Sequence, residues 1–319
     1  MRALFALLPA ALMAQADRVL QSDSEVVTVA FTADGAALAA TCRDGNVRIW
    51  DARSGSLRKS FAWDKGDGAI VLPNTFGLLA TAGSDGSIKV RSLETGAVTR
   101  RVSGVPQRPR DLAFSRDGQA LFAATRTFST GSEESIRAYD PTGKERYATA
   151  AGIGGTSALA LSPDSSVIVA ASYDTNVRAF SVRNGELVRL IDEIPVSTFT
   201  MAFSPDGKLL ASGGVDRALY LWDTKTWKVA RKFTGQSEMI NELAFSPDGT
   251  RIVTGGFSEL TVNNPVQVIV WDAATGKQVR SVTAPRQVSS VAFSPDGKLF
   301  AAATNQKTVH LWSAPPDKR

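Results

Sequence analysis

Histidine and cysteine are nearly missing from this sequence. Its 319 residues include one histidine, His310, and one cysteine, Cys42. A single cysteine excludes an intramolecular disulfide and every Cys-X-X-Cys motif, and it fits a small buried apolar residue. A single histidine excludes metal centres built from several imidazoles. Catalysis of the Ser-His-Asp type also needs that histidine, but His310 stands inside an apolar run and is interpreted as a strand residue.

Signatures of nucleotide and metal binding are also lacking. The glycines stand at regularly spaced turns and form neither a P-loop nor a dinucleotide fingerprint. Residues 64–68 resemble part of a calcium loop, but the full ligand spacing and the terminal glutamate are missing. The sequence therefore predicts no cofactor, no metal and no enzymatic activity.

Charge of one sign is not concentrated in any block of the sequence. The 36 lysines and arginines and the 31 aspartates and glutamates give a net charge of +5, with the signs interspersed. Without a basic block, a nucleic-acid partner is not expected. The hydrophobic content of 43% is sufficient for a sizeable core.

The first sixteen residues differ from the rest of the chain. Arg2 precedes an almost wholly apolar run from Ala3 to Met13, and Ala14-Gln15-Ala16 has the pattern of a signal-peptidase site. The run is shorter than the roughly 20 residues that span a bilayer, so no transmembrane span is expected in the mature chain. We predict that residues 1–16 are a signal peptide and that the protein is exported, either periplasmic or secreted. The alternative is an unprocessed start and a cytoplasmic protein.

One short motif, Phe-Ser-Pro-Asp-Gly, recurs along the chain. Three copies are intact, two are nearly intact and two are degenerate, and the steps between their last residues are 41 to 48 residues. A fixed period of this length indicates repeated structural units. The seven copies occupy residues 31–35, 74–77, 114–118, 161–165, 203–207, 245–249 and 293–297.

Each unit also contains a second landmark and four short apolar runs. In the fifth unit these runs are 200–203, 209–212, 218–222 and 229–233, with turn signals between them. Pro-Asp-Gly sets a tight turn because proline fixes φ and glycine tolerates a positive φ. Four strands per unit at this period are typical of a β-propeller blade. The second landmarks are Trp50-Asp51, Arg91-Ser92, Tyr139-Asp140, Phe180-Ser181, Trp222-Asp223, Trp271-Asp272 and Trp312-Ser313.

With these two landmarks in step, the units resemble WD repeats over essentially all of residues 17–319. The resemblance implies an all-β, seven-bladed β-propeller with four-stranded antiparallel blades. It also implies a non-enzymatic scaffold that binds a protein or peptide and is monomeric by itself. The Gly-His pair that precedes each blade in the family is absent, so no His-Asp-Ser-Trp hydrogen-bond network is expected and the blades should depend more on apolar packing.

The two ends of the chain complement each other. The last unit stops at Leu311-Trp312-Ser313 without a fourth strand, whereas Asp17 to Gln21 reads as a strand placed before the first unit. We expect this N-terminal strand to complete the last blade and close the ring. Closure would hide sheet edges that otherwise favour aggregation.

Two units contain insertions in the same type of loop, at residues 126–134 and 257–265. In the family pattern, the turn between the second and third strands lies on the face with the connections between blades. Both insertions should therefore stand on one rim, where Val215 and Gln107 are also expected, and loops on a rigid scaffold often bind partners. The predicted partner-binding residues are Arg43, Arg108, Arg110, Arg126, Phe128, Tyr173, Phe257 and Leu260.

Four aspartates, at positions 44, 85, 174 and 216, stand in the same turn of their units. They could act as ligands ringing one face, but hydrogen bonding to the turn backbone accounts for them more simply. Three rivals to an exported scaffold stay open at this point. They are an intracellular WD-repeat scaffold, a propeller hydrolase or lactonase, and a periplasmic propeller that resembles TolB, which also has Ser-Pro-Asp-Gly turns.

Overall fold

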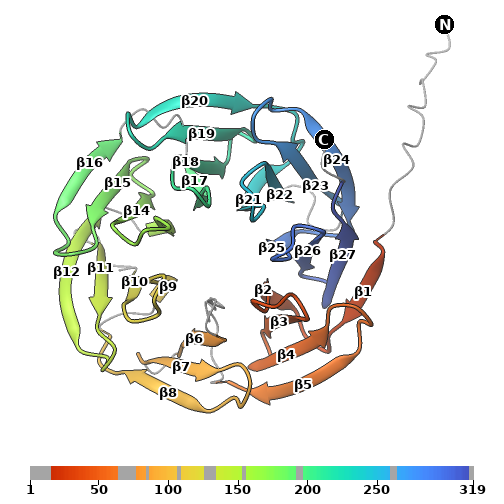
Figure 1. The fold of residues 1–319 in the computed structure, drawn as a ribbon, viewed down its shortest axis with the longest axis horizontal. Helices are drawn as coiled ribbons and strands as arrows, with labels where there is room; N and C mark the ends of the chain where they lie inside the picture. The colour runs from red at the N-terminus through yellow and green to blue at the C-terminus, as the bar shows by residue number, and fades with distance from the viewer. Residues whose placement is uncertain are drawn as a thin grey trace, which may run out of the picture.

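The computed structural model is a ring of antiparallel sheets around a central opening, with the sheets arranged like the blades of a propeller (Figure 1). Its described residues form 27 strands and no helix. The predicted all-β, seven-bladed fold is confirmed. The structure describes residues 16–63, 77–83, 86–105, 109–125, 134–152, 156–191, 197–258 and 264–315.

Within a blade, the strands follow each other from the inside of the ring to the outside. The first blade consists of β2 (Val26–Phe31), β3 (Ala37–Cys42), β4 (Asn46–Asp51) and β5 (Leu57–Ala62). The second contains, within the described residues, β6 (Leu78–Ala82), β7 (Ile88–Ser92) and β8 (Val98–Val102). The third consists of β9 (Pro109–Phe114), β10 (Leu121–Thr125), β11 (Glu134–Tyr139) and β12 (Glu145–Gly152).

The remaining four blades repeat this order. The fourth consists of β13 (Thr156–Leu161), β14 (Val167–Ser172), β15 (Val177–Ser181) and β16 (Leu187–Ile191). The fifth consists of β17 (Thr198–Phe203), β18 (Leu209–Gly214), β19 (Leu219–Asp223) and β20 (Lys228–Phe233). The sixth consists of β21 (Met239–Phe245), β22 (Arg251–Phe257), β23 (Val266–Asp272) and β24 (Gln278–Ala284). The seventh consists of β25 (Val288–Phe293), β26 (Leu299–Thr304), β27 (Thr308–Ser313) and β1 (Arg18–Gln21).

The core lies between neighbouring blades. The second strand of a blade is covered on both faces, and every residue of β3 is buried. Its composition is accordingly small and apolar, because the sheets on either side approach closely. At Gly213 in β18, an added Cβ would come within 2.5 Å of the Ile240 side chain of the next blade. Small residues in the middle strands therefore set the spacing between blades.

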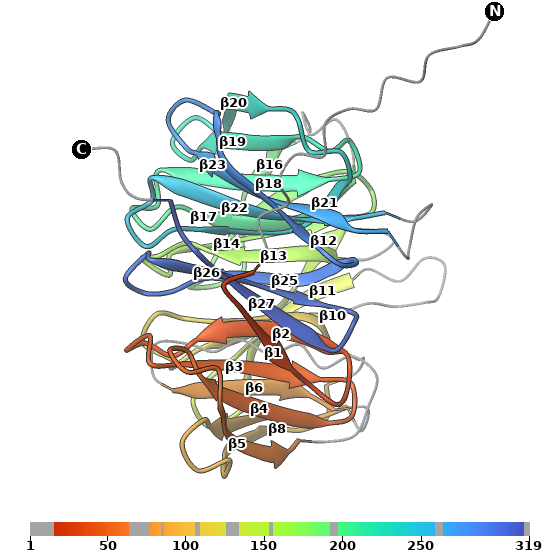
Figure 2. The ribbon, with the colours of Figure 1, turned by 90° about the vertical axis from the view of Figure 1, so that its right-hand side faces the viewer.

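The N-terminal strand closes the ring, as predicted. Strand β1 pairs antiparallel with β27, with Arg18 opposite Leu311 (Figure 2). Leu20 is buried in the core between the seventh and first blades. Two polar contacts fix the strand: the Arg18 guanidinium donates to the Ala52 carbonyl at 2.9 Å, and the Asp17 carboxylate accepts from the Ser313 hydroxyl at 2.7 Å. The first and last strands of the chain thus share one sheet.

The Ser-Pro-Asp-Gly turns follow one geometry and contact each other around the ring. In the fifth blade, the Ser204 hydroxyl donates to Asp206 at 2.7 Å and accepts from the Leu209 amide at 2.9 Å. The first of these bonds, together with the Lys208 amide, holds the pKa of Asp206 below its usual range. Gly207 has a φ of 72°, and an added Cβ at Gly249 would lie 3.3 Å from the Pro205 ring of the preceding blade. The repeated motif therefore forms both the turn and a contact with the next blade.

The landmark tryptophans retain part of the hydrogen-bond network that was expected to be lost. In the fifth blade, Trp222 Nε1 donates to the Ser212 hydroxyl at 2.9 Å. In the sixth, Trp271 Nε1 donates to Thr254 Oγ1 at 2.8 Å, and this hydroxyl donates to Gln236 Oε1 at 2.8 Å. These two blades thus form the tryptophan-to-hydroxyl bond of that network, although no histidine precedes either blade. The reason is that serine or threonine is present in the second strand, and a glutamine on the incoming connection extends the chain of bonds without histidine.

The seventh blade lacks this bond. The register places Trp312 opposite Phe300, so Ala302 stands where Ser212 stands in the fifth blade. Alanine offers no acceptor, and Trp312 Nε1 is buried without a hydrogen-bond partner among the described residues. A buried donor without a partner carries a desolvation cost of about 1–3 kcal/mol.

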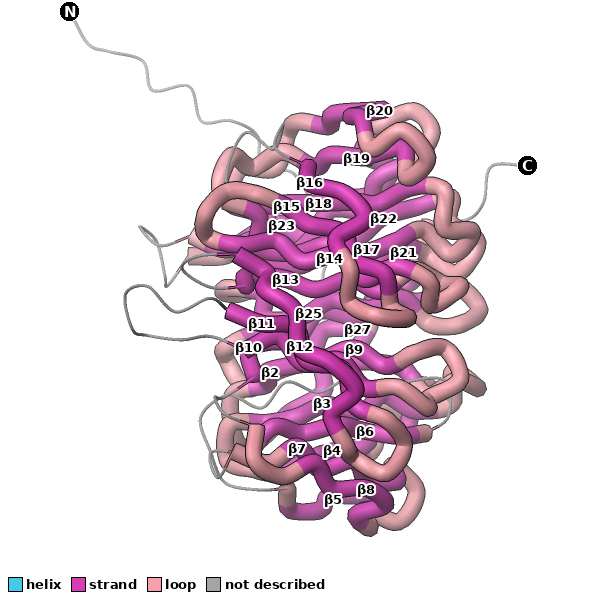
Figure 3. The backbone as a smooth tube through the Cα atoms, turned by 90° about the vertical axis from the view of Figure 1, so that its left-hand side faces the viewer, coloured by secondary structure: helices cyan, strands magenta, loops and turns pink. Residues whose placement is uncertain are grey.

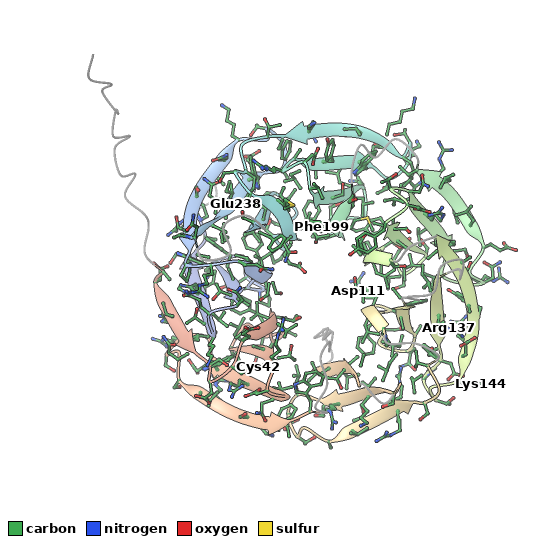
Figure 4. The ribbon with its side chains drawn as sticks, turned by 180° about the vertical axis from the view of Figure 1, so that it is seen from behind. Cys42, Asp111, Arg137, Lys144, Phe199 and Glu238 are labelled. Carbon is green, nitrogen blue, oxygen red and sulfur yellow. The ribbon has the colours of Figure 1, made fainter. Side chains whose placement is uncertain are left out.

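The inner strands bring two carboxylates toward the central channel. Asp111 in β9 lies at the rim of the opening and accepts hydrogen bonds from the amides of Leu112 at 2.8 Å and Leu159 at 2.9 Å (Figure 4). Glu242 comes from β21, the inner strand of the sixth blade. Part of its side chain is accessible, but burial among the inner strands and the charge of Asp111 raise its pKa to about 8.

The closing strand generates the first prediction. Replacing buried Leu20 by alanine should lower the free energy of unfolding by about 2–4 kcal/mol, because the cavity opens in the sheet that joins the two chain ends. The neighbouring exposed Val19→Ala is the matched control and should change it by less than about 0.5 kcal/mol. Removal of residues 17–22 should cause aggregation or a lower melting temperature. An unchanged melting temperature after that removal would show that β1 does not close the ring.

A second prediction concerns the tryptophan bonds. Ser212→Ala should destabilise the protein by about 1–3 kcal/mol, since it leaves Trp222 Nε1 buried without an acceptor. Ala302→Ser should have the opposite effect, of about 1 kcal/mol, by giving Trp312 Nε1 an acceptor. Urea unfolding midpoints of both variants measure the effects. A shift of the same sign in the two variants would contradict the assignment.

A third prediction follows from the raised pKa of Glu242. The pKa of Glu242 is higher in the folded state than its ordinary value of roughly 4.3 in the unfolded chain. Its contribution to stability is therefore fully present below that ordinary pKa, and it is lost as the pH rises toward about 8. Glu242→Gln should therefore stabilise the protein at pH 8, on the order of 2 kcal/mol, and have little effect at pH 4. Denaturant titrations at both pH values test this, with exposed Glu186→Gln as control. Equal effects at the two pH values would refute the shift.

Candidate partner-binding face

The turns between second and third strands lie on the same face as the connections between blades. The amide of Arg43 donates to Glu25 O at 2.9 Å, and the amide of Val215 donates to Ser197 O at 3.2 Å. In each pair the acceptor belongs to the segment that enters the blade. The loops gather on two opposite faces, with the strands running between them (Figure 3). We call the face formed by turns 43–45, 173–175, 215–217 and 305–307 the connection face, and the opposite face, which has the Ser-Pro-Asp-Gly turns, the turn face.

The turn aspartates of the connection face bond to their own backbone. Asp44 and Asp174 accept the amides of Asn46 and Asn176, each at 3.0 Å, and Asp216 accepts the Ala218 amide at 3.2 Å. The interpretation of these three residues as turn-forming rather than ligand-forming is confirmed. Asp85, the fourth, lies outside the described residues.

Two of these aspartates also bind an arginine four residues later. Asp174 accepts from Arg178 at 2.8 Å, and Asp44 accepts from Arg48 at 2.7 Å. The Arg48 side chain is 6% exposed, and its hydrogen bonds with Asp44 raise the pKa of the guanidinium above its ordinary value. Burial raises the pKa of the nearby Cys42 thiol, so this cysteine stays protonated at neutral pH. These ion pairs hold the two turns in place.

Tyr173 and Val215 stand at equivalent positions of the fourth and fifth blades. Tyr173 is 36% exposed and Val215 is 41% exposed. Each directly precedes its turn aspartate, so the backbone beneath both side chains is held by the bonds described above. The Asp216 turn is further held by the Tyr220 hydroxyl, which donates to the Asp216 carboxylate at 2.6 Å. The two side chains provide apolar surface on a fixed backbone.

The other predicted binding residues are distributed as follows. Arg43 is on the connection face with 67% of its side chain exposed, and it forms a 2.9 Å ion pair with Glu25. Phe257 is half-buried at the end of β22. Arg110 lies on the inner strand β9, where only its backbone is described. Gln107, Arg108, Arg126, Phe128 and Leu260 lie outside the described residues.

A groove on the turn face was missed by the sequence analysis. It has a volume of about 900 Å³, lies between the third and fourth blades, and is lined by Arg116 and Arg146 together with Asp117, Asp140 and Asp164. The three carboxylates accept bonds from their own turns, and the Arg146 guanidinium donates to the Arg183 carbonyl at 3.4 Å. The sequence signal was the substitution of the motif's proline by Arg116 and of its glycine by Ser165. These two substitutions indicate a groove only when the two turns are known to be neighbours.

The single histidine has a structural environment. His310 lies in β27 between β26 and β1, its ring stacks on Trp312 at 5.7 Å, and its Nε2 is 3.0 Å from the Thr308 hydroxyl. Burial lowers its pKa, so the ring is neutral at pH 7. Among the described residues there is no group of three or more His, Cys, Asp or Glu side chains suited to hold a metal ion. The same residues contain no helix long and apolar enough to cross a membrane.

Comparisons with known proteins agree with the geometry. The family model "Eukaryotic translation initiation factor eIF2A" matches residues 170–311, "Anaphase-promoting complex subunit 4 WD40 domain" matches 15–75, and "WD domain, G-beta repeat" matches 150–181. The WD repeat-containing protein SL1-17 of Schistosoma mansoni is 25% identical over 171 residues, which cover 51% of this chain and 52% of the relative. The chain thus spans about half the length of that relative.

The matches fall on the same repeats whose landmarks, turns and blades the structure displays. In the fifth and sixth blades, the landmark tryptophan donates its Nε1 hydrogen to a hydroxyl of the second strand, a serine in one blade and a threonine in the other. Seven blades, a ring closed by the N-terminal strand and the matching WD40 models together support the WD-repeat β-propeller family as the family that this chain resembles.

Proposed function

We propose that this protein is an exported, non-enzymatic scaffold that binds a protein or peptide through its connection face. WD-repeat propellers generally act as protein-interaction scaffolds, and that general role applies to this chain through its family. The choice of face and the export are the parts that go beyond the family.

The observation that carries the proposal is the pair Tyr173 and Val215. Nine large hydrophobic side chains are exposed among the described residues, and seven of them belong to the outermost strands. The remaining two are Tyr173 and Val215, on adjacent blades of the connection face. A tyrosine beside an aliphatic residue on fixed backbone is a composition common at the centre of protein interfaces.

The surroundings of this pair suit a protein surface better than a small-molecule site. Arg217, in the same turn as Val215, is an exposed charged residue beside the pair, whereas Arg43 is on the first blade, away from both (Figure 1). The backbone under the pair is already ordered, which reduces the entropy cost of binding. A rigid apolar centre with charged groups further out matches the usual order of a protein–protein contact.

The fold is compatible with export and cleavage before Asp17. The Asp17 carboxylate bonds to Ser313, and the strand that closes the ring begins one residue later. Cleavage between Ala16 and Asp17 would keep this contact and the whole of β1. The apolar residues 3–13 and the small-x-small pattern at 14–16 support the proposal of a signal peptide.

Crosslinking and affinity capture from the native cells test both parts in one experiment. Wild-type bait and a Tyr173→Ala/Val215→Ala variant are compared by mass spectrometry, which also reads the N-terminal peptide of the bait. We expect an N-terminus at Asp17 and envelope or secreted partners whose recovery falls at least about tenfold in the variant, since loss of two central side chains costs more than about 1.4 kcal/mol.

The matched control is Lys208→Ala/Lys298→Ala on the turn face, where both side chains are 81% exposed. This variant should recover the partners at the wild-type level. Partners that are indifferent to the Tyr173→Ala/Val215→Ala variant would reject the connection face. A retained Met1 with cytoplasmic partners would reject export and favour an intracellular scaffold.

A further inference from the structure

The outer wall of the ring carries charge of one sign. In the seven outermost strands there are eleven lysines and arginines and one acidic residue, Glu145. The whole chain is almost balanced, with 36 cations and 31 anions, so the bias belongs to these strands. Charges on an edge strand, lysine above all, also protect it against aggregation. The cations are Arg18, Arg58, Lys59, Arg100, Arg101, Arg146, Arg189, Lys228, Arg231, Lys232 and Arg280.

Strand β16 is the exception in this wall, because it is mainly apolar. Leu187, Val188 and Leu190 are 55%, 54% and 43% exposed, whereas no other described outermost strand has more than one exposed large hydrophobic residue. Strand β16 pairs only with β15 and stands at the end of its sheet. Its outer edge thus offers backbone donors and acceptors beside apolar side chains, the arrangement to which an added strand binds.

Three cations on β16 and on the next outer strand are not paired within the described part of the chain. Arg189 lies within β16, and Lys228 and Arg231 belong to β20, which follows β16 along the outer wall (Figure 1). None of the three forms an ion pair or a side-chain hydrogen bond with the described residues. Arg58 on β5, in contrast, is paired with Asp51. An unpaired cation in an open apolar edge favours binding of an acidic ligand, because the opposite charges attract.

We propose that the outer edge of β16 binds an extended, acidic segment of a partner protein, which adds to the fourth blade as a fifth strand. Aliphatic side chains of the segment cover Leu187 and Leu190, and one of its carboxylates pairs with Arg189. A second copy of this chain fits less well. If two β16 strands paired antiparallel about their midpoint, Arg189, the middle residue of five, would face its own copy, and like charges directly opposite are destabilising.

The probe for this site is an acetylated, fluorescein-labelled peptide of sequence Thr-Val-Glu-Val-Glu-Val-Thr, titrated into the full chain and followed by fluorescence anisotropy. We expect saturable binding that weakens about tenfold in Arg189→Glu and about tenfold in Leu187→Thr/Leu190→Thr. Hydrogen exchange should show slower exchange of the β16 amides in the presence of the peptide, which charge attraction alone does not produce. All substituted residues are exposed, so melting temperatures should match the wild type.

The matched control is Val98→Thr/Arg101→Glu on β8, an outermost strand with one exposed aliphatic residue and an exposed arginine. It should keep the wild-type affinity within about twofold, and so should Tyr173→Ala, because the connection face is a separate surface. The two proposals can therefore fail independently.

Several results would overturn the proposal. Absence of peptide binding would do so, as would equal binding of the peptide with lysine in place of glutamate. Binding of phosphatidylglycerol vesicles or single-stranded RNA that depends on Arg189, without protection of β16 by the peptide, would assign the wall to another class of polyanion. Dimerisation in sedimentation experiments that Leu190→Lys abolishes would make a second copy the occupant.

Discussion

Each blade of this ring can cover its faces only with its two neighbours, and the rest of the structure depends on that mutual burial. The middle strands are made of small apolar residues, so the sheets approach until an added Cβ at Gly213 would touch Ile240 of the next blade. A single open gap would expose two such faces. For this reason the chain ends must share one sheet, and β1 supplies the strand that the seventh blade lacks.

This constraint also explains why the repeated motif is so visible in the sequence. The hydroxyl, carboxylate and glycine of each Ser-Pro-Asp-Gly copy shape the turn locally, and its proline contacts the glycine of the following blade. The requirements of the turn and those of the contact with the next blade therefore fall on the same four consecutive residues. The seven blades, their turns and the closing strand could therefore be predicted from the sequence, because each leaves a signal within one repeat or at one end of the chain.

Features that depend on which residues become neighbours were not predicted. Gln236 extends the bond chain of Trp271 through Thr254, although these residues are widely separated in sequence. The groove beside Arg116 needs the turn of the next blade, where the Ser165 hydroxyl accepts a hydrogen bond from the Arg116 amide at 2.9 Å. Of the candidate site, the sequence placed Arg43, Tyr173 and Val215 on one face through their common place in the repeat. It could not distinguish their exposure from that of other turn residues.

The same radial order separates the surfaces that are left for binding. The apolar residues of the middle strands are buried between blades. The exposed large apolar side chains are therefore on the outermost strands and on the connection face. On the outer wall, cations beside most of these side chains keep the edges from pairing with one another. On the connection face, Asp174 pairs with Arg178 in the turn of Tyr173, and Asp216 accepts from the Ala218 amide and the Tyr220 hydroxyl in the turn of Val215. The two proposed binding surfaces therefore differ in chemistry and do not overlap: the wall would attract an acidic partner, and the connection face would bind one that buries an aromatic and an aliphatic side chain.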